Sequence, residues 1–353
     1  MGRGHHANPP VGAVFAAALL AFATPAAGTD GTLLVLNKAD STASFVDLGS
    51  GEVVATLPTG EGPHEVAVSA DGTIAVAANY GTRAAAGGSL TVLDVAGARV
   101  VRTIDVGAGG RPHGIVFVER RRAVVTVEGA RALRVVDVER GAVEATIETG
   151  QEISHMVAVT PDGTRAFVAN IGSGTVTAVD LRARRVLAQI RTGEGAEGIA
   201  VRPGGREVWV TNRAADTLSV LDTASLAVVA RIPCASFPIR VAFTPDGERA
   251  IVTNARSADV AVVDADARKV ISRMTAALGA AGGGGRLLAF EGSTPIGVVV
   301  SPDGAHAFVA HANADAVADL DLETGQVRRT LRAGREPDGM GYSRLRVEPG
   351  ARR

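Results

Sequence analysis

The chain has 353 residues, with 36 basic and 37 acidic side chains, and its 43 glycines contrast with nine Phe, two Tyr and one Trp. A hydrophobic content of 46% excludes a disordered chain, and a single cysteine excludes a disulfide framework or a zinc cluster built on cysteines. The balanced charge argues against nucleic acid as a partner, while many glycines and few aromatics are typical of short strands joined by tight turns.

The N-terminal segment has the three-part layout of a secretory signal. A polar stretch that contains Arg3 precedes the apolar run 11–23, and small residues follow at 24–28. An apolar run of this length is too short to span a bilayer of about 30 Å as a helix. We predict a signal peptide over 1–28, export to the periplasm or beyond, and no transmembrane anchor after cleavage. An uncleaved membrane anchor is the alternative.

The rest of the chain, 29–353, is built from seven copies of one repeat. Each copy holds four short apolar runs with period-two alternation, which is typical of a four-stranded antiparallel sheet. The second run of each copy ends at a fixed position, which we place at Asn37, Asn79, Glu128, Asn170, Asn212, Asn254 and His311. Seven such sheets predict an all-β fold, a seven-bladed β-propeller of four-stranded antiparallel blades in a single domain.

The two ends of the repeat region complement each other. The mature chain begins with the second run of a copy, 32–37, and the missing first run stands at the C-terminal end, 337–343. We predict that this C-terminal strand pairs with the N-terminal blade and closes the ring, because closure leaves no exposed sheet edge. The insertion 278–293 is predicted to be a surface loop, and 344–353 a flexible tail.

The repeats 168–181, 210–232 and 252–274, for example VTNRAADTLSVLD, resemble the YVTN-type β-propeller repeat. They do not resemble WD40 repeats, since Trp209 is the only tryptophan and no Trp-Asp dipeptide occurs. The wider superfamily includes the haem-binding cytochrome d1 propellers of nitrite reductases, the copper-binding propeller of nitrous oxide reductase, lactonases, and exported propellers without an established activity. The resemblance therefore implies the architecture and leaves the activity open.

The candidate site is the end of the central channel at which the first strand of each blade begins. Four of the five histidines outside the leader fall on this rim. The predicted ligand-binding rim consists of His64, His113, His155, Glu128, Glu197, Arg240, His311 and Asp338.

Neutral imidazoles suit copper, zinc or iron, so His64, His113 and His155, on adjacent blades, are the candidate metal ligands. In the nitrous oxide reductase propeller that the chain resembles, histidines at blade ends hold copper. Glu197 and Arg240 are the candidates for a catalytic role, Glu197 as acid or base, Arg240 as a clamp for a carboxylate or phosphate or as the partner of Glu197. The alternative is structural, with the rim histidines bonded to loops of neighbouring blades.

The sequence names no ligand, because a fold does not determine a function. We predict a monomeric exported propeller that is a non-catalytic binding or scaffold module and holds a small ligand or a periplasmic protein partner at the histidine-bearing end. The first alternative is a metal- or haem-dependent oxidoreductase component, for which copper, zinc and haem are the cofactors left open. The second is a lactonase-like hydrolase.

Overall fold

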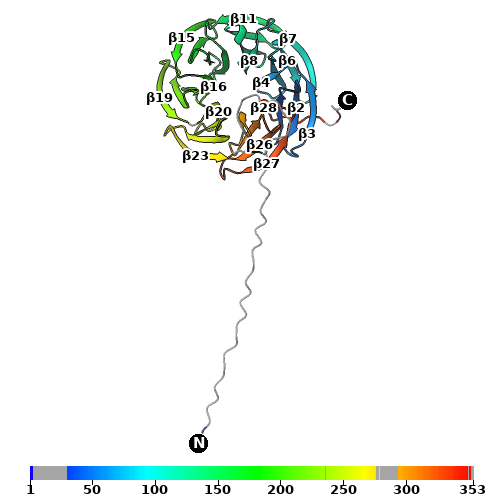
Figure 1. Cartoon of the computed structure of the whole chain (residues 1–353). Helices are drawn as coiled ribbons and strands as arrows, with labels where there is room; N and C mark the ends of the chain where they lie inside the picture. Colours follow the sequence, from blue (N-terminus) through cyan, green and yellow to red (C-terminus); the bar gives the residue numbers. More distant parts are fainter. Residues whose placement is uncertain (3–29, 235, 276–277, 279–292, 349, 351–353) are drawn as a thin grey trace.

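The computed structural model describes residues 1–2, 30–234, 236–275, 278, 293–348 and 350. In this part of the chain, 28 strands form seven four-stranded antiparallel sheets arranged as blades around one axis (Figure 1). The one helix among the described residues is the 3-10 turn η1 (Glu128–Ala130), and no helix there is long and apolar enough to cross a membrane. The predicted seven-bladed propeller is confirmed. Nearly all of the predicted signal peptide 1–28 and of the insertion 278–293 lies outside the described residues.

Every blade has one inner strand beside the axis and three strands that follow it toward the outside (Figure 1). From the inner strand outward, blade 1 is β28 (Pro337–Ser343), β1 (Thr32–Asn37), β2 (Thr42–Asp47) and β3 (Val53–Pro58). Blade 2 is β4 (Pro63–Val68), β5 (Ile74–Gly81), β6 (Ala86–Asp94) and β7 (Arg99–Asp105), and blade 3 is β8 (Pro112–Phe117), β9 (Arg122–Val127), β10 (Ala132–Asp137) and β11 (Ala142–Glu148). Blade 4 is β12 (Ser154–Val159), β13 (Arg165–Asn170), β14 (Thr175–Asp180) and β15 (Arg185–Arg191), and blade 5 is β16 (Ala196–Val201), β17 (Glu207–Asn212), β18 (Thr217–Asp222) and β19 (Ala227–Pro233). Blade 6 is β20 (Pro238–Phe243), β21 (Arg249–Asn254), β22 (Asp259–Asp264) and β23 (Lys269–Thr275), and blade 7 is β24 (Pro295–Val300), β25 (His306–His311), β26 (Ala316–Asp321) and β27 (Val327–Arg332).

The ring is closed by the two ends of the repeat region. Strand β28 pairs antiparallel with β1, so that Leu34 lies opposite Gly341. Beyond β28, the Thr32 hydroxyl donates a hydrogen bond to the Leu345 carbonyl oxygen at 2.7 Å, and the Glu348 amide donates to the Ala96 carbonyl oxygen at 2.9 Å. The predicted closure is therefore confirmed, and the residues just after β28 are bonded to blades 1 and 2.

The asparagine that ends the second strand forms side-chain hydrogen bonds within its blade and to the connection that precedes the blade. The side-chain amide of Asn37 donates to the hydroxyls of Thr42 at 3.0 Å and Ser44 at 2.9 Å on the neighbouring strand. Its carbonyl oxygen accepts from the Gly334 amide at 2.8 Å, in the segment that arrives from blade 7. The asparagine thus ties its blade to the preceding connection, which explains its recurrence without a ligand.

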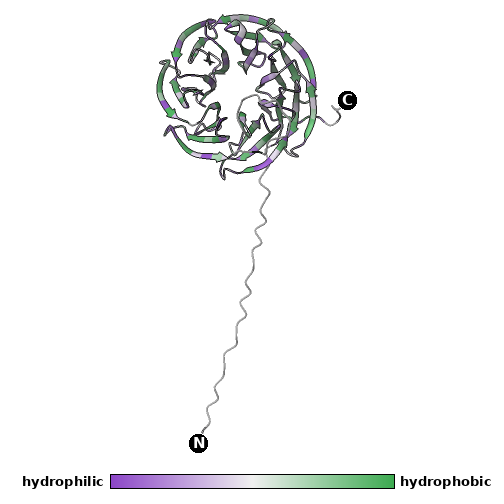
Figure 2. Cartoon of the chain, in the orientation of Figure 1, coloured by the Kyte–Doolittle hydropathy of each residue, from purple (hydrophilic) through white to green (hydrophobic). Residues whose placement is uncertain are grey.

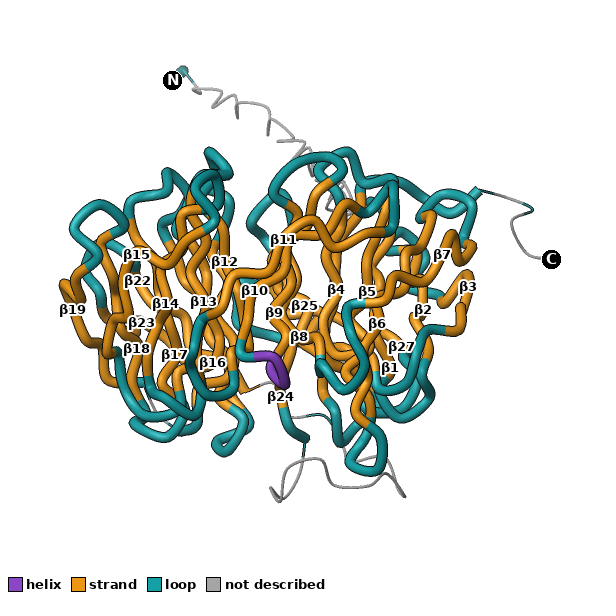
Figure 3. Tube along the Cα trace, turned by 90° about the horizontal axis from the view of Figure 1, so that it is seen from above, coloured by secondary structure: helices purple, strands orange, loops and turns teal. Residues whose placement is uncertain are grey.

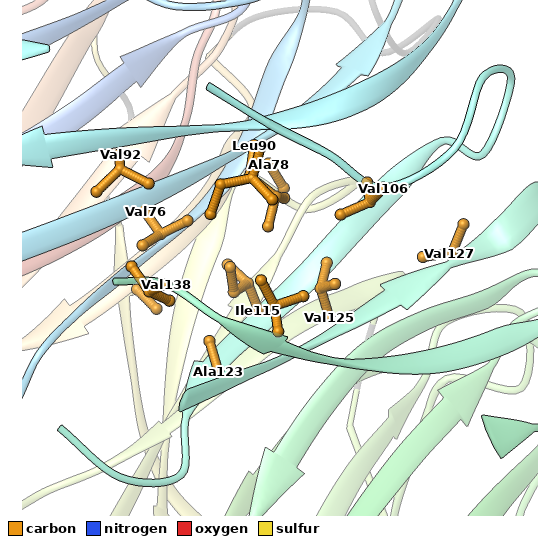
Figure 4. Close-up of a cluster of buried hydrophobic side chains, with 13 residues drawn as sticks. Val76, Ala78, Leu90, Val92, Val106, Ile115, Ala123, Val125, Val127 and Val138 are labelled. Atoms are coloured by element: carbon orange, nitrogen blue, oxygen red, sulfur yellow. The ribbon is translucent and has the colours of Figure 1, made fainter. Parts of the chain in front are cut away.

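Hydrophobic side chains of neighbouring blades form the core between them, and each blade carries such segments (Figure 2). Between blades 2 and 3, Val76, Leu90 and Val92 pack in one cluster with Ile115 and Val125 (Figure 4). Burial of one such side chain contributes about 1.5–3 kcal/mol. Because the interfaces around the ring repeat this packing, the propeller is held together by apolar burial and not by polar groups at its axis.

The inner strands approach one another so closely that glycine is required at some of their third residues. From blade 1 to blade 7 the third residues are Gly339, Glu65, Gly114, Met156, Gly198, Arg240 and Gly297. A Cβ atom on Gly198 would lie 2.2 Å from the Ile239 carbonyl oxygen, and one on Gly297 would lie 2.1 Å from that of Asp338. In both cases the added Cβ would collide with the backbone of the next inner strand. For this reason only some blades carry a side chain at the third residue of the inner strand.

Replacement of Gly198 by alanine is expected to destabilise the protein by about 2–3 kcal/mol, because the added methyl group overlaps a backbone atom that cannot move away freely. The control is Gly49→Ala, whose Cβ would meet the flexible end of Arg346 at 2.9 Å and which should cost about 0.5 kcal/mol or less. Urea unfolding followed by the fluorescence of the buried Trp209 measures both. Equal losses in the two variants would contradict close packing of the inner strands.

Candidate functional site: a charged cluster at the propeller axis

Two residue positions of each blade bring side chains to the axis at the end where the inner strands begin, which we call the mouth face. The first is the second residue of the inner strand; from blade 1 to blade 7 these are Asp338, His64, His113, His155, Glu197, Ile239 and Ile296. The second directly follows the repeat asparagine or its equivalent; these are Lys38, Tyr80, Glu128, Ile171, Arg213, Ala255 and Ala312. Polar residues thus prevail in blades 1–5, whereas blades 6 and 7 are apolar at both positions.

The pairing register decides which predicted rim residues reach the axis. Pro112 pairs with Val127, so Val127 and not Glu128 is the residue of blade 3 that corresponds to the repeat asparagines. Since side chains alternate along a strand, the following residue, Glu128, points to the opposite side and reaches the axis. His311 pairs with Pro295 and therefore takes the asparagine position itself. It is buried, lies 2.5 Å from the Ser293 hydroxyl, and contacts none of the described axial side chains.

The three rim histidines lie next to one another, as predicted from their adjacent blades. The ring centroids of His64 and His113 are 4.9 Å apart, and those of His113 and His155 are 3.6 Å apart. His64 Nδ1 lies 3.1 Å from His113 Nε2 and 3.6 Å from an oxygen of Asp338. Tyr80 stacks on His64, with centroids 4.4 Å apart, and its ring lies edge-on to that of His113, with centroids 5.4 Å apart.

Carboxylates connect the histidines to cationic groups. His155 Nδ1 lies 2.6 Å from Glu128, and His155 Nε2 lies 3.6 Å from Glu197. Glu197 in turn accepts hydrogen bonds from Arg213 at 2.6 Å and from Arg240 at 3.1 Å. The Tyr80 hydroxyl donates to the second oxygen of Glu128 at 2.7 Å. The predicted pairing of Arg240 with Glu197 is therefore present.

Arg240 also crosses the axis. Its Nη2 and Nε atoms donate to Glu65 Oε1 at 2.6 and 3.1 Å, which joins blade 6 to blade 2. Both residues are third residues of their inner strands, the level at which most other blades have glycine. The pair is largely buried, with 8% of the Arg240 side chain and 13% of the Glu65 side chain exposed. On the neighbouring blade, Lys38 Nζ lies 3.1 Å from Asp338.

These eleven side chains form one connected group, which we call the axial cluster. Its members are Lys38, His64, Glu65, Tyr80, His113, Glu128, His155, Glu197, Arg213, Arg240 and Asp338. Lys38, Glu65, Tyr80 and Arg213 were not predicted. Lys38, Tyr80 and Arg213 directly follow the repeat asparagines, and the alternation of side chains, continued past the asparagine, was the signal available for these three. Glu65 directly follows His64 in β4, where alternation gives no such signal.

The histidines of the axial cluster differ in protonation. Burial, reinforced by Lys38, lowers the pKa of His64 to about 3, and burial together with the neighbouring histidines lowers the pKa of His113 well below its ordinary value. Burial acts on His155 in the same direction, but the bonds to Glu128 and Glu197 outweigh it and raise its pKa. At neutral pH, His64 and His113 are therefore neutral, whereas the raised pKa of His155 favours its protonated form.

When His155 is protonated, it balances the charge of the axial cluster. Burial raises the pKa of Glu65, and the Arg240 guanidinium opposes that effect. Burial likewise opposes ionisation of Glu197, but His155 and the two arginines outweigh it and lower the pKa of Glu197 to about 2. When Glu65 is ionised beside Arg240 and His155 is protonated, four carboxylates face two arginines, one lysine and one imidazolium. The cluster is then electrically neutral, as burial of charged groups requires. Glu197 stays ionised at neutral pH, which does not favour the predicted acid or base role.

The geometry gives the predicted metal ligands no support. Within the described ranges, no three His, Cys, Asp or Glu side chains are placed to hold one metal ion. The nearest pair of imidazoles, His113 and His155, lie ring against ring with an angle of 33° between their planes. A haem, the cofactor implied by the resemblance to cytochrome d1 propellers, does not fit this arrangement either. His155 has a carboxylate at each ring nitrogen, His113 is buried, and Tyr80 covers a face of His64.

Comparisons with known proteins agree with the architecture. Residues 7–122 match the profile of the YNCE-like beta-propeller, and residues 120–271 match that of the cytochrome D1 heme domain. None of the curated proteins matches the sequence. Similar solved structures include hydrazine synthase of Kuenenia stuttgartiensis, with a TM-score of 0.66 and 19% identity over 89% of this chain and 98% of that one.

A functionally unknown protein of Desulfotomaculum acetoxidans is also similar, with a TM-score of 0.75 and 14% identity over 90% of this chain and 100% of that one. At such identities both structures bear on the fold alone. The two profile matches and the seven blades confirm the predicted resemblance to propellers of the cytochrome d1-like kind, and each profile matches less than half of the chain.

Proposed function

We propose that the protein is an exported binding module that holds a ligand or a partner at its mouth face, in contact with the axial cluster. The observation that carries this proposal is the asymmetry of the ring. Blades 6 and 7 fill the same two positions with Ile239, Ala255, Ile296 and Ala312, so the repeat folds without polar groups there. Blades 1–5 instead supply the four carboxylates of the axial cluster, and the cationic partners come from these blades and from Arg240, the third residue of the blade 6 inner strand.

Such a buried network contributes little net stability. Replacing buried ion pairs by apolar side chains of similar size is often neutral or even stabilising, because the charges must be removed from water. Clusters of this kind with shifted pKa values are concentrated at functional sites. The apolar packing between blades already holds the propeller together, so we assign the axial cluster to recognition.

Part of the axial cluster is open to solvent. The side chains of Arg213 and His64 are 30% and 19% exposed, and Tyr80 is half-buried. The Arg111 guanidinium lies 4.9 Å above the Tyr80 ring, and that of Arg213 lies 5.2 Å from the Phe237 ring. A bound molecule would therefore meet the edge of His64, the Tyr80 ring and the Arg213 head group, with the buried carboxylates behind them.

Native mass spectrometry of protein recovered from exporting cells tests this proposal. We expect wild type to carry a bound small molecule or partner that is lost on denaturation, and His64→Gln and Tyr80→Ala to carry less than about a third of it, since each removes a ring that contacts the ligand. Arg83→Ala, an exposed residue in the turn between β5 and β6, is the control and should retain the ligand in full. A bare wild-type chain, or equal loss in all three variants, would contradict the proposal.

The same samples address the oxidoreductase alternative, which the match to the cytochrome D1 heme domain over 120–271 supports. Metal analysis and visible absorbance are compared between wild type and the triple variant His64→Ala, His113→Ala, His155→Ala. Stoichiometric copper, zinc or iron, or a haem spectrum, that disappears in a triple variant with unchanged circular dichroism would replace the binding module by a redox component.

A further inference from the structure

A second surface, opposite the mouth face, departs from the repeat in blade 3. In blades 2, 4, 6 and 7 the turn between the first two strands contains Asp-Gly, and the aspartate bonds within the turn, as Asp71 does to Ser69 and Thr73. In blade 3 this turn contains Glu119, Arg120 and Arg121 instead. The two faces of the propeller are seen at the ends of the strands in Figure 3.

A groove of about 390 Å³ lies between this turn and blade 2. Its apolar lining consists of Ile74, Val92, Val101 and Val138, and Figure 4 shows Val92 and Val138 at one end of the hydrophobic cluster between the two blades. Its polar lining consists of Thr73, Arg102, Arg120, Arg121 and Glu139. An apolar lining with a few polar groups, at the lower end of the usual volume range, is typical of a site for a small molecule.

The arginines of the groove carry more positive charge than their partners neutralise. Arg120 meets Asp71 at 3.2 Å and Arg121 meets Glu139 at 2.7 Å, in pairs whose arginine side chains are 77% and 65% exposed. Arg102 has no ion pair or side-chain hydrogen bond to any residue in the described part of the chain. Exposed pairs of this kind are weak, so all three guanidinium groups are free to turn toward a carboxylate.

The neighbouring groove, between blades 3 and 4, shows that this charge is not a general property of the repeat. It is also partly apolar, with Val118, Val124, Val135 and Leu181 in its lining. However, its three arginines are matched by the carboxylates of Glu119, Glu144 and Asp162. In the groove between blades 2 and 3, three arginines face Glu139 and, through Arg120, Asp71. Of these two grooves, it is therefore the one that combines an apolar floor with an excess of cationic donors.

We propose that the groove between blades 2 and 3 binds a small aliphatic carboxylate. The hydrocarbon chain lies on Ile74, Val92, Val101 and Val138, and the carboxylate is held by Arg102 with Arg121 or Arg120. This site is separate from the axial cluster and lies on the opposite face, so it can be present or absent independently of the proposed function.

Calorimetric titration of the wild-type protein with sodium octanoate tests the assignment. We expect a dissociation constant of about 1 mM or below, and at least about tenfold weaker binding of acetate and of octanol, since one lacks the chain and the other the charge. The tripeptide Ala-Ala-Leu with a free carboxylate tests a polypeptide end as the source of the same chemistry. Tighter binding of this peptide than of octanoate would overturn the assignment to a free aliphatic acid.

The variant pair Arg102→Ala, Arg121→Ala should weaken octanoate binding at least about tenfold through loss of the charged donors. The matched control, Arg99→Ala, Arg140→Ala, removes two other exposed arginines from the same two blades and spares the groove. It should leave the affinity within about twofold of wild type, as expected for surface charges that do not touch the ligand. No binding of octanoate up to about 10 mM, or equal weakening in both double variants, would overturn the proposal.

Discussion

Replacement of Arg240 by leucine is expected to lower the free energy of unfolding by about 3–5 kcal/mol, because it leaves a buried carboxylate without its cation. Glu65 has Arg240 as its ion-pair partner at 2.6 Å across the axis, and Glu197 loses one of its two arginines. Urea unfolding followed by Trp209 fluorescence measures the loss.

Two further variants separate this effect from a simple loss of packing. The double variant Arg240→Leu, Glu65→Leu removes both charges and should recover most of the lost stability. Arg335→Leu removes an arginine that is 63% exposed and pairs with Asp40 on the surface, and should cost about 1 kcal/mol or less. If the double variant were as unstable as Arg240→Leu alone, the cost could not come from an unpaired Glu65.

Acid is expected to destabilise the protein from about pH 6.5 downward, before most carboxylates titrate. The folded-state pKa of His64 is about 3 and that of His113 is also far below the ordinary value of 6.5, so the unfolded chain binds protons first. The stability that these two residues contribute is therefore present above about pH 6.5 and is lost as the pH falls, by about 1.4 kcal/mol per pH unit for each residue. Glu197, with a pKa of about 2, adds to the loss below about pH 4.5.

The contribution of His155 to stability changes with pH in the opposite direction. Because its pKa is raised in the folded state, its contribution is full below the ordinary value and is lost as the pH rises through the raised value. Measurements of the unfolding free energy between about pH 4.5 and 8.5 test both the loss of stability in acid and the loss at higher pH. His64→Gln should reduce the acid slope by about 1.4 kcal/mol per pH unit, whereas His155→Gln should leave that slope unchanged and remove the loss above about pH 6.5. An unchanged acid slope in His64→Gln would show that its imidazole is not held neutral.

Much of the fold could be predicted because each blade is specified by local patterns. Alternating apolar residues, turn glycines and a recurring asparagine define four strands per copy, and seven copies define the ring. Closure through 337–343 followed from a missing strand at one end and an extra one at the other. The predicted strands agree with the structure because strand pairing in a propeller is almost entirely between sequence neighbours.

The candidate site could be predicted only in part. The three adjacent histidines and Glu197 were found from their position at the start of the first strands, and Arg240 because it breaks the symmetry of the repeat. Glu128 was assigned to the wrong register position, since the segment before it lacks the asparagine that marks the end of the strand in most other blades. A shift of one residue reverses the side to which a side chain points, and a repeat alignment cannot resolve such a shift without the marker residue.

The sequence by itself determined the number of strands, the number of blades, the closure of the ring and the types of residue available at its axis. Only the tertiary structure decided which of those residues meet. Glu65 and Arg240 are 175 residues apart and contact each other because the curvature of the ring brings blades 2 and 6 together across the axis. The raised pKa of His155 also depends on the closed ring, because Glu128 and Glu197 reach its two ring nitrogens from the two flanking blades. Local sequence patterns specify strands, but electrostatics acts through space, and the distances that set it exist only once the ring is closed.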